Sequence, residues 1–139
     1  MAKFAFRLEK VLHYRADREK AAKNAYLSKR LEVLAQEAVI EKNRERRLAI
    51  LSEPRTTLTD FRTLEGELIR LDDNERMEKV VLSVLYDEEK AQRVAWTRQK
   101  QELETVVKLR EKAFDEWTRE VDRREQAELD EWSVLRRVA

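Results

Sequence analysis

The sequence is poor in the residues that make turns: its 139 residues include one glycine, Gly66, and one proline, Pro54. Compact α/β and all-β folds need many turns, and turns depend on Gly, Pro, Asn and Asp for their backbone angles. A single glycine also excludes a glycine-rich phosphate-binding loop. The scarcity therefore predicts a few long elements in place of many short ones.

Cysteine is absent, which excludes disulfides, zinc–thiolate sites and thiol nucleophiles. Histidine occurs once, as His13, with Glu9 and Asp17 four residues to either side. These three side chains could share a helix face, but the Glu-x-x-His pairs of helical di-iron sites are missing. A hydrolytic triad would also need a nucleophile on a shaped loop. We expect no metal, no cofactor and no enzymatic activity.

Long hydrophobic runs are missing too. The most apolar stretch, residues 80–86, is far shorter than the roughly 20 residues of a membrane-spanning helix. Charged residues follow the first six positions at once, unlike in a signal peptide. We expect a cytoplasmic protein that does not insert directly into the membrane.

Charged residues are abundant instead, at 42% of the chain, but their net charge is only +1. Ala, Glu, Lys, Leu and Arg dominate, which is typical of long helices and coiled coils. Disorder is disfavoured because 42% of residues are hydrophobic and recur periodically. The basic residues of 42–47 alternate with Glu41 and Glu45, unlike the dense basic run of a DNA-binding zipper. We expect no nucleic-acid partner.

Helical spacing of apolar residues predicts two helices, at about 3–52 and 59–136. Pro54 ends the first, and the turn falls at about 53–58. Thr57 and Asp60 have the spacing of a capping box at the start of the second helix. Residues 71–75 are a rival turn. In the first helix the predicted buried stripe consists of Leu8, Val11, Leu12, Leu27, Leu31, Leu34, Ala38, Leu48 and Leu51.

The second helix follows a heptad frame in which nine of fifteen positions are apolar. The frame runs through 68, 71, 75, 78, 82, 85, 89, 92, 96, 99, 103, 106, 110, 113 and 117. Two long helices joined by one turn fold back antiparallel and bury their apolar faces. We therefore predict an all-α antiparallel coiled-coil hairpin, a single domain over 1–139 with a longer C-terminal helix, monomeric in isolation.

A tight turn at 53–57 predicts that facing positions sum to about 111, which brings Phe4 near Val107. About thirty C-terminal residues then extend unpaired. They carry large aromatic side chains that we expect to face a partner: Phe114, Trp117 and Trp132. Residues 1–30 contain nine Lys or Arg and three acidic residues, whereas residues 111–131 contain nine acidic residues and four basic ones. This opposition favours the antiparallel arrangement.

The two ends of the chain resemble the FliJ family of flagellar export proteins. The start, Lys3-Phe4-Ala5-Phe6-Arg7-Leu8-Glu9-Lys10-Val11-Leu12, matches a family pattern F-x-F-x-L-x-x-V/L-L. The C-terminal part of the resemblance lies in residues 109–113, Trp117, Glu120, 123–125 and 129–131. Trp132 and the short tail after it depart from the family pattern, in which small apolar residues are expected.

The resemblance implies a stalk of the flagellar type III export apparatus, similar to the central stalk of rotary ATPases. Such a stalk enters and stimulates the hexameric export ATPase and links it to the transmembrane export gate, at the cytoplasmic face of the inner membrane. A role in handling export chaperones is also attributed to the family. The residues expected to bind the ATPase are Phe4, Arg7, Leu8, Arg123, Arg124, Asp130 and Glu131. The segment 48–71 would be free for the gate. A virulence-injectisome stalk and a generic coiled-coil scaffold remain alternatives.

Overall fold

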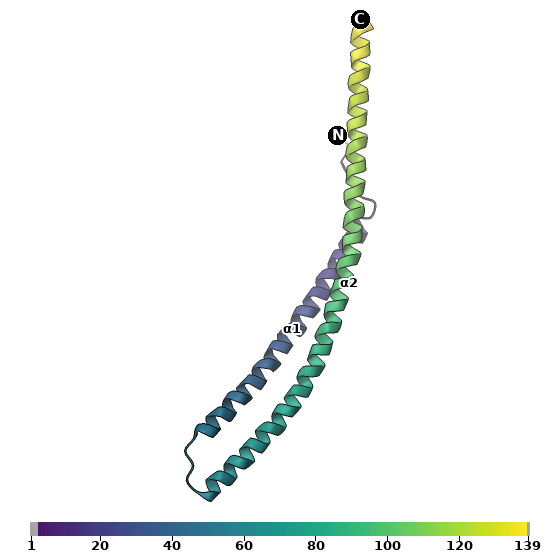
Figure 1. The fold of residues 1–139 in the computed structure, drawn as a ribbon. Coiled ribbons are helices and arrows are strands. Elements are labelled where there is room, and N and C mark those ends of the chain that lie inside the picture. The colour runs from purple at the N-terminus through teal and green to yellow at the C-terminus, as the bar shows by residue number, and fades with distance from the viewer. Residues whose placement is uncertain (1–2, 139) are drawn as a thin grey trace. The chain divides into compact units, whose positions relative to one another are not determined.

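The computed structural model describes residues 3–138, which form two helices and no strand. Helix α1 spans Glu9–Ser52 and helix α2 spans Leu58–Val138, in antiparallel order (Figure 1). The predicted all-α hairpin with a longer second helix is confirmed. The contacts fall into two units: a terminal unit, within which the described residues are 3–20 and 97–138, and a turn unit, residues 21–96.

The connection between the helices lies in the turn unit and ends in the predicted capping box. The Asp60 backbone N–H donates to Thr57 Oγ1 over 3.1 Å, and the Thr57 N–H donates to an Asp60 carboxylate oxygen over 3.3 Å. Hydrogen bonds from the Thr57 side chain and backbone lower the pKa of Asp60. The rival turn at 71–75 is wrong, because these residues are helical and Leu71 is only 7% exposed.

The heptad frame of α2 is confirmed at every position. All fifteen predicted positions are buried or half-buried, and most of the residues between them are exposed. Polar members of the frame are included, and Glu89 is only 8% exposed. The pairing surface of α2 therefore alternates apolar and polar layers.

The predicted stripe of α1 is wrong over most of its length. Leu27, Leu31, Leu34, Leu48 and Leu51 are between 44% and 68% exposed. The row that packs against α2 is instead Leu12, Ala16, Glu19, Ala22, Tyr26, Lys29, Val33, Gln36, Ile40, Asn43, Arg47 and Ile50. Several of these are polar because α2 supplies their partners. A leucine pattern alone therefore selects the wrong face of α1.

Ion pairs between the helices fix the register. In the turn unit Lys29 pairs with Glu88 at 2.8 Å, and Arg44 pairs with Glu75 at 3.0 Å. The residue numbers of these two pairs sum to 117 and 119. The predicted sum of about 111 for facing positions is therefore wrong by about seven residues. In the terminal unit, Arg15 with Glu102 gives the sum 117.

The shift arises because the connection at 53–57 is open and not tight (Figure 1). Five extended residues can span about 16 Å, and at 1.5 Å per residue α2 can therefore begin several residues beyond the end of α1. Arg55, whose side chain is only 11% exposed, stabilises the connection. Its guanidinium donates to the Asp60 carbonyl over 3.1 Å and pairs with Glu67 at 3.6 Å.

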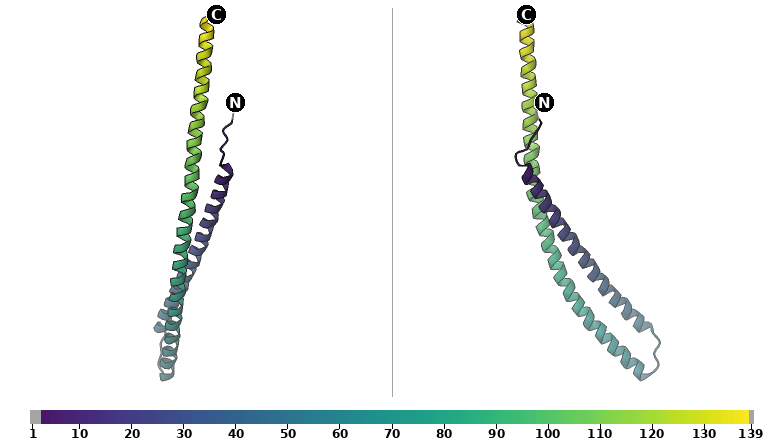
Figure 2. Two further views of the ribbon diagram at one scale, coloured as in Figure 1. Left: turned by 90° about the vertical axis from the view of Figure 1, so that its right-hand side faces the viewer. Right: turned by 180° about the vertical axis from the view of Figure 1, so that it is seen from behind.

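The terminal unit begins with a non-helical segment. We predicted a helix from about residue 3, but α1 begins at Glu9, and residues 3–8 lie beside α2 (Figure 2). Phe4, Phe6 and Leu8 alternate with exposed residues. A period of two suits an extended chain at residues 3–6, whereas a helix would turn these side chains to different faces. Residues 7 and 8 form the turn that leads into α1. At the other end of the unit, every described residue after Val121 is exposed.

Candidate partner-binding surface

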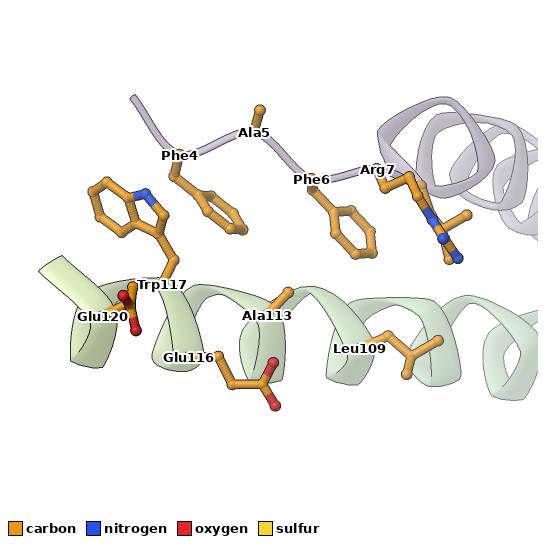
Figure 3. Close-up of a pocket in the computed structure, with 10 residues that line it drawn as sticks. Phe4, Ala5, Phe6, Arg7, Leu109, Ala113, Glu116, Trp117 and Glu120 are labelled. Atoms are coloured by element: carbon orange, nitrogen blue, oxygen red, sulfur yellow. The ribbon is translucent and has the colours of Figure 1, made fainter. Parts of the chain in front are cut away.

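The segment 3–8, here called the strap, lies along α2 in the terminal unit. Figure 3 shows the rings of Phe4 and Phe6 directed toward the helix, over the stretch from Leu109 to Trp117. Alternate residues of an extended chain are about 6.6 Å apart, and helix residues four apart rise about 6 Å. The spacing of Phe4 and Phe6 therefore matches the four-residue spacing of Trp117 and Ala113. At Arg7 and Leu8 the chain turns into α1, and the Glu9 N–H donates to the Phe6 carbonyl over 3.2 Å.

An aromatic cluster holds the tip of the strap. The Phe4 ring meets Phe114 edge-on, with centroids 5.2 Å apart, and lies 5.8 Å from Trp117. The Arg110 guanidinium is 5.6 Å from the Phe4 ring centroid. Aromatic pairs of this kind prefer edge-to-face geometry, and a guanidinium over a ring adds a cation–π attraction. The same Arg110 pairs with Glu9 at 3.3 Å, so one side chain ties both the strap and the first turn of α1 to α2.

The strap and α2 together enclose an open groove of about 520 Å³. Its walls are mostly apolar: Phe4, Ala5, Phe6, Leu8, Leu109, Ala113 and Trp117. Arg7, Glu116 and Glu120 supply its charged groups. An apolar groove with a few charges suits a protein side chain flanked by polar groups.

The structure brings together four of the residues that the sequence singled out. Phe4, Arg7, Leu8 and Trp117 all line the groove, and Phe114 packs beside it. Two expectations are corrected: Phe4 does not lie level with Val107, and Phe114 and Trp117 are not on an unpaired overhang. Because the register of α1 on α2 differs from the predicted one, the strap packs against Phe114 and Trp117.

The charged residues of the C-terminal motif lie farther along α2. Arg123 and Arg124 pair with Glu120, at 3.6 and 3.4 Å, and both side chains are more than 70% exposed. Glu120 thus links this basic pair to the groove. The arginines present their charge to solvent.

Asp130, Glu131 and Trp132 are not brought to the groove. Asp130 lies about 20 Å beyond Trp117 along α2, at 1.5 Å per residue. It accepts a hydrogen bond from Gln126 over 3.0 Å, and Trp132 is 70% exposed. The sequence therefore grouped two surfaces of the terminal unit that the structure separates.

The sequence reasoning missed Phe6, Leu109, Ala113 and Glu116 as parts of a site, and it missed the double role of Arg110. The signal was present in two spacings. Apolar residues two apart preceded α1, and apolar residues four apart recurred from Leu109 onward. Comparing the two periods would have predicted a strap on a helix.

The part of the chain that the structure describes has no candidate metal site. Residues 3–138 contain no group of His, Cys, Asp and Glu able to hold a metal ion. The His13 side chain is 73% exposed and lies 3.6 Å from Glu9. Nor does either helix, over the same residues, have a stretch long and apolar enough to cross a membrane.

Comparison with known proteins identifies the family. The family model described as the flagellar FliJ protein matches residues 4–137. The chain belongs to the FliJ family. The match covers both the strap and the C-terminal half of α2, so it includes the whole candidate surface. No curated protein and no solved structure matched the chain. Membership of the FliJ family supports a structural or chaperone-like role in flagellar type III protein export.

Proposed function

We propose that this FliJ-family chain is the stalk of the export apparatus and that its terminal unit binds the hexameric export ATPase and stimulates hydrolysis. The strap groove carries the proposal. It gathers Phe4, Arg7 and Leu8, three of the residues that we expect to contact the ATPase, on one apolar surface with Trp117.

The region beyond the groove supports the same assignment. Residues 122–138 continue α2 with every side chain exposed, and Leu129, Trp132 and Leu135 are each more than 60% exposed. A helix with that much exposed apolar surface is expected to bind a partner. The ring would then contact the groove, the exposed arginines and this last part of α2.

The turn unit is proposed to contact the export gate through residues 48–71. Large apolar side chains in this segment are exposed: Leu48 by 66%, Leu58 by 68%, Phe61 by 52% and Ile69 by 55%. The protein would act as a single copy in the ring, at the cytoplasmic face of the inner membrane. Export chaperones are further proposed partners.

The test is hydrolysis by the purified cognate ATPase with and without the full chain, after co-purification of the two. Replacing Arg123 and Arg124 by Glu should abolish stimulation, because both are exposed and reversing their charge leaves the helix pairing untouched. The matched control is Lys42→Glu/Arg46→Glu, an equal charge reversal at exposed positions of the turn unit. Unchanged stimulation by the Arg123/Arg124 variant would overturn the assignment.

A further inference from the structure

Two segments of the terminal unit carry opposite charges that do not meet within one chain. Residues 120–131 contain six acidic residues and two arginines, whereas residues 3–20 contain six basic residues and three acidic ones. No ion pair joins these segments in the part of the chain that the structure describes. The reason is that α2 continues beyond the strap, where every described residue after Val121 is exposed.

One exposed face of α2 beyond the strap combines apolar and acidic side chains. Glu125, Glu128, Leu129 and Trp132 line one hollow of about 530 Å³ there. Their spacing of i, i+3, i+4 and i+7 keeps all four on one side of the helix. No other described segment accompanies α2 at this point (Figure 2). The exposed apolar groups indicate a partner, and the carboxylates favour a basic one.

The outer face of α1 in the same unit has this basic and apolar chemistry. Lys10, Tyr14 and Arg18 are four residues apart and exposed, on the side away from Leu12 and Ala16. The Arg18 guanidinium lies 5.7 Å from the Tyr14 ring centroid. Neither Lys10 nor Arg18 forms an ion pair with another described residue. The face therefore offers an aromatic ring between two cations that have no acidic partner in the chain.

We propose that this face of α1 binds the end of α2 of a second copy of the chain, in a reversible antiparallel dimer. The α1 helix of an antiparallel copy runs parallel to the α2 helix of the first. With Tyr14 of one copy level with Leu129 of the other, residues 7–18 come level with residues 122–133. Four of these level positions hold opposite charges and none holds like charges, which favours this register over others.

The charges on the two packed faces are themselves paired. Lys10 comes level with Glu125 in the centre of the contact. On its flank, Arg18 and Glu128 stand in the relation of the e and g positions of a parallel coiled coil, which form ion pairs between helices. Asp17, an acidic residue on the same face of α1, has no carboxylate level with it. The contact thus joins an apolar pair to two ion pairs.

The register of the hairpin makes the contact reciprocal. Since Arg15 pairs with Glu102, Tyr14 is level with about residue 103 of its own α2. When Tyr14 of the second copy lies level with Leu129 of the first, Leu129 of the second copy lies level with residue 103 of the first. It therefore meets Tyr14 of the first copy. Both contacts form at once about a two-fold axis, so the dimer is closed.

The proposal goes beyond the stalk function and does not rest on it. It replaces the expectation of a monomer for the free chain at high concentration. The charge pairs of the interface are exposed and screened by salt, so the dimer dissociates readily.

Sedimentation equilibrium of the full chain tests for the dimer. We expect a monomer–dimer equilibrium between about 1 and 100 µM, weakened when salt is raised from about 0.05 to about 0.5 M. Leu129→Ala should weaken the dimer by more than about tenfold, because the lost contact occurs twice. Leu31→Ala is the matched control, since Leu31 is 68% exposed on α1 of the turn unit, and it should change nothing. A monomer throughout the range, or an equal effect of both variants, would overturn the proposal.

Mixing two charge-reversed variants tests which residues meet between copies. Lys10→Glu and Glu125→Lys should each weaken self-association by about tenfold, because each sets like charges level twice. An equal mixture of the two variants should dimerise as the parent chain does, since each chain then presents the opposite charge to the other. Lys42→Glu is the control: it makes the same charge change at an exposed position of the turn unit and should not restore dimers with Glu125→Lys. No recovery in the first mixture would refute the register.

Cross-linking tests the same arrangement without changing charge. The absence of cysteine allows single thiols to be introduced. A mixture of Tyr14→Cys and Leu129→Cys should oxidise to a disulfide-linked dimer, because these positions face each other between copies. Either variant alone should stay unlinked, since its two thiols lie about 40 Å apart along the dimer at 1.5 Å per residue. Self-linking of either variant, or no mixed disulfide, would rule the arrangement out.

Discussion

Val33 gives the sharpest test of the helix pairing, because it is 0% exposed at the centre of the α1 row. Replacing Val33 by Ala removes two buried carbon atoms, at about 0.8 kcal/mol each, and leaves a small cavity that adds to the cost. Alanine is also the better helix former, by about 0.5 kcal/mol. The net loss of unfolding free energy should be about 1–2 kcal/mol.

Val80→Ala separates the two contributions. Val80 lies in the same unit and is 65% exposed, so its replacement keeps the gain in helix propensity and loses almost no burial. We expect this variant to be unchanged or slightly more stable. Urea unfolding followed by circular dichroism at 222 nm measures both variants. If Val33→Ala were no more destabilising than Val80→Ala, Val33 would not be buried in the helix pairing.

Two further predictions concern α2 in the turn unit. Gly66→Ala should raise the unfolding free energy by about 0.5–1 kcal/mol, measured by thermal melting, because Gly66 is helical and an added Cβ has no atom within 4 Å; a lower melting temperature would contradict this. The Arg44 hydrogen bond lowers the pKa of Glu75, so the stability from this pair is present above the ordinary carboxyl pKa and is lost as the pH falls through the lowered one. The melting temperature of Glu75→Gln should therefore fall less than that of the parent chain below about pH 4, and parallel pH profiles would contradict the pairing.

Much of the fold could be predicted because α2 has a single consistent pattern. Its heptad frame includes both apolar positions such as Leu71 and polar ones such as Glu89, and the structure buries both kinds. The capping box at Thr57 and Asp60 was also readable, since it depends on residues three apart. Local rules were enough where the interactions were local.

The prediction failed where the decisive interaction joined distant segments. The buried row of α1 contains Lys29 and Arg47, whose burial makes sense only beside the acidic residues of α2. The register depended on the open conformation of the connection, which the sequence does not state. The strap was included in the helix predicted from about residue 3, because no glycine or proline precedes Pro54. The packing of Phe4 against Phe114 and Trp117, far along the chain, favours a non-helical segment instead.

The proposed contact of the strap and α2 with the export ATPase can be measured through the hydrolysis rate of the purified ATPase as the full chain is added. Phe4→Ala/Trp117→Ala removes the aromatic contact between strap and helix, whereas Phe61→Ala removes an aromatic ring that is 52% exposed in the turn unit. We expect the first variant to lose most of the stimulation and the second to retain it. Full stimulation by Phe4→Ala/Trp117→Ala would show that the aromatic contact of the strap does not engage the ATPase.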